Sequence, residues 1–98
     1  MIIRIVKMTF DPERVQEFEA VFDASKEKIR GFEGCLHLEL LRQADAPNVY
    51  FTYSYWEAAS NLEAYRHSEV FKSTWAKTKP LFVAKPEAWS LDRLVQLP

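Results

Sequence analysis

Cysteine is almost absent from this sequence of 98 residues: Cys35 stands alone, so no internal disulfide can form. A lone cysteine fits a reducing compartment, and we expect a cytoplasmic protein. Neither sign of charge dominates either, because 13 basic residues face 14 acidic ones and the net charge is −1. No basic run of the kind that follows a phosphate backbone is present, which argues against nucleic acid as a partner.

Long apolar segments are missing as well. Arg4 and Lys7 interrupt the opening MIIRIVKMTF, so we expect neither a secretory signal nor a membrane span, and no membrane partner. Repeats and linkers do not occur, and the length suits a single domain over residues 1–98. No nucleophile motif, phosphate-binding loop or metal-spaced cluster is visible, so no metal is predicted.

The sequence is rich in apolar and aromatic side chains, with 48% hydrophobic residues, 7 Phe, 4 Tyr and 3 Trp. They concentrate in the stretch FTYSYWEAASNLEAYRHSEVFKSTW, residues 51–75. Its first part alternates like a strand, and its second part has the spacing of helices over 58–65 and 68–79. This arrangement places Tyr65 and Trp75 over the same face of a sheet.

The remaining elements follow from turn and cap signals. Asp11-Pro12-Glu13 starts a helix that ends at Gly31, and Phe22 lies in the middle of its apolar face, where we expect it to be buried. The predicted strands span residues 2–9, 35–42, 49–56 and 86–94. The order β-α-β-β-α-β, with its second helical part split, is an α+β, ferredoxin-like arrangement: a four-stranded antiparallel sheet with helices on one face.

Both faces of this sheet are apolar in several places. On the first strand Ile3 and Ile5 oppose Val6 and Met8, and Leu41 opposes the other leucines of the second strand. A monomer would expose the face without helices. We therefore expect a homodimer built sheet to sheet, with an interface on the order of 2,000 Å² or more.

The element order and several segments resemble the antibiotic biosynthesis monooxygenase (ABM) domain over essentially the whole chain. The segments are IVKMTFDPERVQEFEAVF, GFEGCLHLELLR, TYSYW and EAYRHSEVFKSTW. The resemblance implies a dimeric α+β barrel with a pocket in each subunit between sheet and helices. It also implies one of the family's activities, which are cofactor-independent oxygenation of polycyclic aromatics and quinols, haem breakdown, and isomerisation of small signalling molecules.

The haem-degrading branch of this family has an asparagine, a tryptophan and an iron-ligating histidine where this chain has Arg4, Tyr65 and Trp75. An indole N–H is only a donor, so Trp75 cannot ligate iron, and we expect no haem. The branch that is similar to quinol monooxygenases and signal isomerases commonly has histidine at or near Tyr65 and Val70, and this chain keeps neither.

Three polar residues are candidates for catalysis. Arg4 stands within an apolar stripe, so it is either a partner for a ligand anion in a pocket or a salt-bridged structural residue. Tyr65 is a candidate hydrogen-bonding group. His37 and Glu39 share one strand face as a possible acid–base pair, with His37 as the base; alternatively they bridge to charges such as Arg4 or Lys7 across a dimer interface.

Aromatic side chains could line a pocket for a flat substrate, or they could be plain core. These candidates for substrate binding are Tyr53, Tyr55, Trp75 and Trp89. Together the residues and the resemblance predict a cofactor-independent monooxygenase acting on a small aromatic or quinol-like molecule, with Arg4, His37 and Tyr65 as catalytic residues. The alternative is a non-catalytic homodimer of the same fold that binds a small ligand or has a structural role.

Overall fold

The computed structural model describes all residues of the chain, 1–98. Its elements are β1 (Ile2–Thr9), a 3-10 turn (Pro12–Arg14), α1 (Val15–Arg30), β2 (Cys35–Arg42), β3 (Val49–Trp56), α2 (Ala59–Arg66), α3 (Glu69–Thr78), a second 3-10 turn (Lys79–Leu81) and β4 (Glu87–Leu91). No helix is both long and apolar enough to span a membrane.

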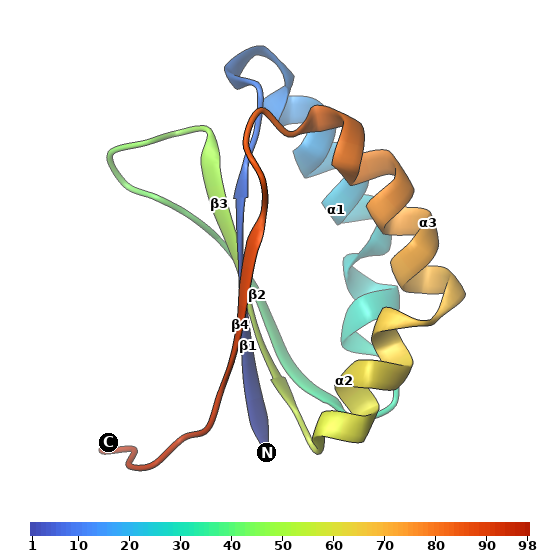
Figure 1. Ribbon diagram of the computed structural model, residues 1–98, viewed down its shortest axis with the longest axis vertical. Coiled ribbons are helices and arrows are strands. Elements are labelled where there is room, and N and C mark those ends of the chain that lie inside the picture. Colours follow the sequence, from blue (N-terminus) through green and yellow to red (C-terminus); the bar gives the residue numbers. More distant parts are fainter.

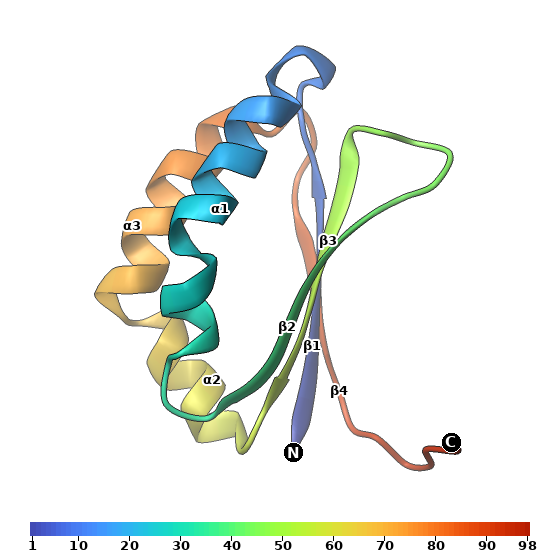
Figure 2. The same cartoon turned by 180° about the vertical axis from the view of Figure 1, so that it is seen from behind.

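The four strands form one antiparallel sheet in the order β2-β3-β1-β4. Figure 1 shows the sheet nearly edge-on, with α1, α2 and α3 all on the same side of it. The view from behind in Figure 2 shows the same two layers, and no helix covers the second face. The predicted α+β, ferredoxin-like fold is confirmed.

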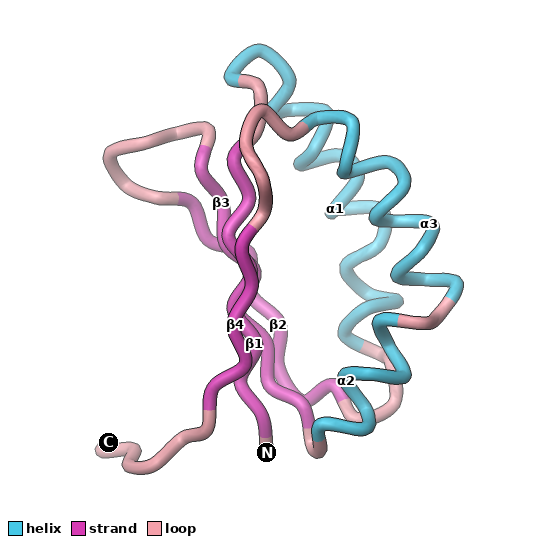
Figure 3. The backbone as a smooth tube through the Cα atoms, viewed as in Figure 1, coloured by secondary structure: helices cyan, strands magenta, loops and turns pink.

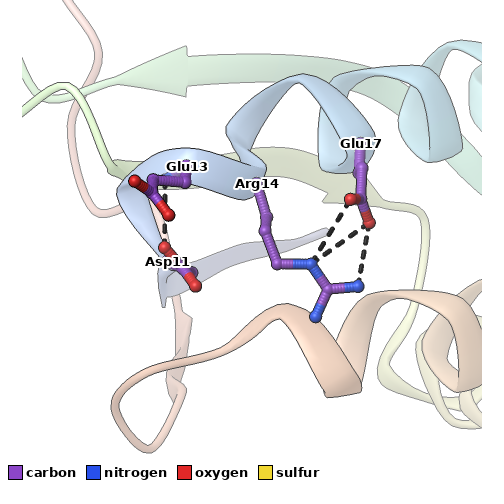
Figure 4. Close-up of polar contacts among 4 residues, drawn as sticks. All are labelled: Asp11, Glu13, Arg14 and Glu17. Atoms are coloured by element: carbon purple, nitrogen blue, oxygen red, sulfur yellow. Dashed lines mark hydrogen bonds and ion pairs between the residues drawn. The ribbon is translucent and has the colours of Figure 1, made fainter.

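The beginning of the first helix follows from its sequence. The Asp11 carboxylate accepts a hydrogen bond from the backbone N–H of Glu13 at 3.0 Å, and Pro12 has no N–H that needs a partner (Figure 4). Arg14 pairs with Glu17 at 2.9 Å one turn later. The first turn is a 3-10 turn rather than α-helix, so α1 itself begins at Val15.

The main core lies between α1 and the end of the sheet where β1 ends and β3 begins. Phe10 stacks on Phe18 at 4.1 Å between ring centroids, and the edge of Tyr50 meets Phe18 at 5.2 Å. Phe18 is only 2% exposed, whereas Phe22 is partly buried and borders a cavity. Phe22 is thus only partly buried where the sequence predicts burial, because its ring packs against the core on one side and borders the cavity on the other.

Two details of the strands also differ from the sequence-based expectation. A β-bulge between Cys35 and His37 breaks the alternation, so Leu36 is exposed instead of lying with Leu38 on the inner face. The last strand ends at Leu91 and not at residue 94. Leu91 pairs with Ile3, and β1 begins only one residue before Ile3, so little of β1 is left to pair with. Residues 92–98 then leave the sheet on the side away from the helices (Figure 3).

Candidate active site

A cavity of about 250 Å³ lies between the sheet and the helices. Its wall is mostly apolar and takes side chains from all four strands and all three helices. The lining residues are Arg4, Val6, Met8, Phe18, Phe22, Ile29, Leu38, Thr52, Ser54, Trp56, Leu62, Tyr65, Arg66, Phe71, Thr74, Trp75, Thr78, Pro86 and Ala88.

Arg4 lies on β1, in the middle of the cavity floor. Its guanidinium donates to the Ser90 hydroxyl at 3.0 Å, and no carboxylate lies within salt-bridge distance of it. Burial lowers the pKa of Arg4, and the nearby charge of Arg66 lowers it further, while Glu63 acts in the opposite direction. Arg4 is thus a partly desolvated cation without a counter-ion in the protein.

Two hydroxyl side chains of β3 complete the polar floor. Ser54 is the direct neighbour of Arg4 across the β1–β3 pairing, and Thr52 follows one step along the same face. The indole N–H of Trp56 donates to the Ser54 hydroxyl at 3.0 Å, so this hydroxyl is held in place. The sequence alone did not indicate Ser54, Thr52 or Arg66 as site residues. The sequence YFTYSYW of β3 could have indicated Thr52 and Ser54, because these small polar residues alternate with aromatic ones and share a strand face with Trp56.

Tyr65, in the last turn of α2, forms part of the wall above this floor. Its ring stacks on Trp56 at 5.0 Å between centroids and meets the edges of Phe32 and Phe71 at 5.5 and 5.3 Å. Burial and, to a smaller extent, the Cys35 thiol raise the pKa of Tyr65 to about 12. Its hydroxyl makes no hydrogen bond within the chain, so a neutral donor is available to a ligand.

Trp75 enters the cavity from α3. The Ser68 hydroxyl accepts from the backbone N–H of Phe71 at 3.2 Å and so begins this helix, as its sequence indicates. Phe71 and Trp75, one helical turn apart, have nearly parallel rings with centroids 5.7 Å apart. The predicted placement of Tyr65 and Trp75 over one sheet face is confirmed.

The other sequence-predicted site residues lie on the opposite face of the sheet. Alternate strand residues point to opposite faces. Arg4 and its partners in β3 and β4 lie on the cavity side, whereas Ile5 lies on the other side together with its partners Tyr53 and Trp89. His37 and Tyr55 are paired on that same outer face. The structure therefore brings Arg4, Tyr65 and Trp75 together and separates His37, Tyr53, Tyr55 and Trp89 from them.

These outward-facing residues form a cluster of their own. The His37 ring stacks on Tyr55 at 4.6 Å, and its Nε2 contacts a carboxylate oxygen of Glu39 at 2.5 Å. The Tyr55 hydroxyl donates to that of Tyr53 at 3.2 Å, and the guanidinium of Arg93 lies over the Tyr55 ring. A bridge from His37 or Glu39 to Arg4 across a sheet-to-sheet interface does not fit this geometry, because Arg4 points into the cavity.

The cavity has a simple chemical character. Its wall contains no histidine, cysteine, aspartate or glutamate, and its polar atoms come from two guanidinium groups and a few hydroxyls. No group of three or more His, Cys, Asp or Glu side chains in the structure could hold a metal ion. The arrangement can bind a flat apolar molecule and stabilise negative charge at its centre.

Comparisons with solved structures show the same fold. A structure described as antibiotic biosynthesis monooxygenase has a TM-score of 0.91 at 17% identity, covering 97% of this chain and 100% of that chain. Rv0793 from Mycobacterium tuberculosis has a TM-score of 0.89 at 18% identity, covering 99% and 98%. A conserved protein from Methanosarcina mazei Go1 has a TM-score of 0.87 at 23% identity, covering 93% and 91%.

At these identities the similarity establishes the fold alone. No curated protein matches the sequence. The sequence profile of the family described as antibiotic biosynthesis monooxygenase, however, matches residues 1–77, which include the first three strands and nearly all of the three helices. The chain therefore belongs to the antibiotic biosynthesis monooxygenase (ABM) family.

Proposed function

We propose that this protein is a monooxygenase that acts on a small aromatic or quinol-like molecule held in the cavity between sheet and helices. The observation that carries the proposal is the guanidinium of Arg4, without a carboxylate partner, at the floor of an aromatic cavity that Tyr65 also lines. Family membership supports the same class of chemistry. The cavity volume of about 250 Å³ suits a molecule smaller than a typical drug-sized ligand.

The chemistry depends on the substrate as the source of electrons. An ionised phenol or quinol passes one electron to dioxygen, which gives a substrate radical and superoxide. The two combine to a hydroperoxide at a ring carbon, and loss of water leaves a carbonyl. One oxygen atom thus enters the substrate and the other leaves in water, whose two hydrogens come from the phenol O–H and from the C–H of the oxidised ring carbon.

Arg4 and Tyr65 have defined roles in this scheme. Arg4 attracts and orients an anionic substrate, and this effect grows where the bound ring excludes water. Tyr65 stays protonated because its pKa is raised to about 12, so its hydroxyl donates to a substrate oxygen. Trp75 and Phe71 provide flat surfaces for the ring.

Oxygen uptake with purified protein and small hydroquinones, without added cofactor, tests the proposal. We expect catalysed uptake, a loss of roughly 100-fold for Arg4→Met, and a smaller loss for Tyr65→Phe. Lys26→Met on the outer surface of α1 removes the same charge and should leave the rate unchanged. Uptake no faster than in buffer would contradict the proposal.

A second candidate function is non-catalytic binding of a small ligand by a homodimer. It is favoured by one observation: the wall of the cavity offers no imidazole or carboxylate as a general base. His37, the base expected from the sequence, lies on the outer face of the sheet. Tight binding of a quinol without oxygen uptake would support this candidate over the monooxygenase.

A further inference from the structure

The cavity carries more positive charge than the proposed oxygenation of a quinol requires. The wall contains the two guanidinium groups of Arg4 and Arg66 and no carboxylate. The nearest acid that acts on Arg4 is Glu63, which forms its own ion pair with Arg66 at 3.3 Å. Arg4 therefore has a net positive surrounding and no anion of its own.

Leaving a guanidinium in this state is unfavourable for the empty protein. Arg4 is partly buried, its pKa is lowered by that burial, and its one side-chain hydrogen bond goes to the neutral Ser90 hydroxyl. A guanidinium has five N–H donors, so most of them remain available. A partly buried cation is normally paired, because the desolvation that it suffers is recovered only through a counter-charge.

The neighbours of Arg4 indicate which anion fits. Ser54 and Ser90 are its partners on the two adjacent strands, so short hydroxyl side chains flank Arg4 on both sides, and the guanidinium contacts that of Ser90. Short neighbours leave the planar fork of donors open to the cavity. A planar carboxylate matches that fork with two parallel hydrogen bonds, which a lysine ammonium could not offer.

The rest of the cavity favours a ring attached to this anion. Trp56, Tyr65, Phe71 and Trp75 follow one another in ring contact along the wall, with centroid separations of 5.0, 5.3 and 5.7 Å. The remaining wall is largely aliphatic, from Val6, Leu38 and Leu62. A flat molecule with one charged edge satisfies both regions at once.

We propose that the substrate is an aromatic carboxylic acid, with its carboxylate bound by Arg4 and its ring held against the aromatic wall formed by Trp56, Tyr65, Phe71 and Trp75. Arg66 adds a weaker attraction at the side of the cavity, since it already pairs with Glu63 and is about half exposed. This inference rests on the proposed function, because it names the chemical class of molecule that the same cavity oxidises.

Binding of two matched probes tests the inference without turnover. 2-Naphthoate and 2-naphthamide have the same ring and nearly the same shape, but only the first is an anion at neutral pH. Titration calorimetry should show the wild-type protein binding the acid at least about 10-fold more tightly than the amide, as expected for charge-assisted hydrogen bonds.

Variants assign that preference to a residue. Arg4→Met should remove the preference for the acid, and Arg66→Met should reduce it only about 2- to 3-fold, as for an exposed charge. The matched control is Lys7→Met, which removes the same charge from the same strand but from its other face, and should leave the ratio unchanged.

Each outcome decides. Equal binding of acid and amide by the wild type, or binding of neither, overturns the inference, and this result does not depend on whether any variant folds. A preference that survives in folded Arg4→Met also overturns it. If naphthoate binds as expected but hydroquinone-type acids consume no oxygen, the proposed oxygenation fails while the carboxylate site stands.

Discussion

The two faces of the sheet do not divide into an apolar and a polar face in the usual way. In an antiparallel sheet covered on one side, the covered face is normally apolar and the open face polar. Here the centre of the covered face carries Arg4, Thr52 and Ser54, whereas the open face carries Ile5 and Tyr53 in the corresponding place. Polar residues are tolerated under the helices because a cavity lies above them.

The open face is apolar in several places, and this indicates that another surface covers it. Large apolar side chains remain exposed there, with Leu41 at 44%, Trp89 at 43% and Leu91 at 43%. Several large apolar side chains exposed on one face of a sheet are uncommon on a monomer. A second copy of the chain, which presents the same face, is the partner that we expect. We therefore expect the covered face to hold the reaction and the open face to form the assembly.

Breaking the open face should have the largest effect. We expect the wild-type protein to sediment at twice 11.5 kDa, and Trp89→Glu to weaken self-association by at least roughly 100-fold, because a charge would be buried in an apolar interface. Sedimentation equilibrium at micromolar concentration measures both. Ala24→Glu is the control, since Ala24 is exposed on α1, on the helix side of the sheet. A stably folded wild-type monomer of 11.5 kDa would refute the assembly.

Breaking the covered face should cost folding free energy in proportion to burial. Phe18→Ala removes a ring that is 2% exposed and packed against Phe10 and Tyr50, and we expect a loss of roughly 3–5 kcal/mol. Phe22→Ala one turn later should cost only about 1 kcal/mol, because this ring is partly buried and borders the cavity. Urea unfolding at one protein concentration compares them. Equal losses would mean that the cavity is filled by side chains.

The fold could be predicted from the sequence because its signals are local. Asp11 with Pro12 indicates the start of the first helical segment, Ser68 indicates the start of α3, and β-branched, leucine-rich or aromatic runs bounded by turn residues indicate three of the four strands. The end of the last strand could not be predicted, because it depends on where β1 runs out as a partner at Ile2. Strand pairing is a tertiary property and overrides the apolar character of Leu94.

The site was less predictable, for a physical reason. The sequence identifies which residues share a strand face, but it does not reveal which face the helices cover. Arg4 and His37 are both polar residues on apolar strands, and nothing local shows that one faces the cavity and the other the open side. Burial of Tyr65 between Trp56, Phe32 and Phe71 likewise depends on how α2 packs.

Titration of the Tyr65 hydroxyl tests how deeply the covered side of the sheet is buried. Burial raises the pKa of Tyr65 from 10.0 to about 12, so the unfolded chain releases this proton at lower pH than the folded one. The contribution of neutral Tyr65 to stability is therefore complete below about pH 10 and is lost as the pH rises towards about 12. Relative to Tyr65→Phe, the wild type should lose on the order of 2 kcal/mol over this range.

Urea unfolding of both proteins at neutral pH and near pH 11.5 measures this difference, because the other titrating groups are common to the pair. An absorbance titration of the folded protein provides the second readout. It should show a phenolate signal that appears only as the pH approaches about 12 and that is missing in Tyr65→Phe. A difference between the two proteins that does not change with pH would place the Tyr65 hydroxyl in water rather than in the cavity wall.

The smallest effect concerns the ion pair between Lys7 and Glu87 on the open face. The two residues are paired across β1 and the edge strand β4, their charged atoms are 3.9 Å apart, and their side chains are 36% and 57% exposed. This location suits the rim of an assembly interface rather than its centre, where a desolvated pair would be strongly coupled. A double-mutant cycle with Lys7→Met and Glu87→Gln should give a coupling of about 0.5 kcal/mol, falling further in roughly 1 M salt. The unfolding measurements need one fixed protein concentration, because the stability of a dimer depends on it. A coupling above about 2 kcal/mol that persists in salt would place this pair inside the interface rather than at its rim.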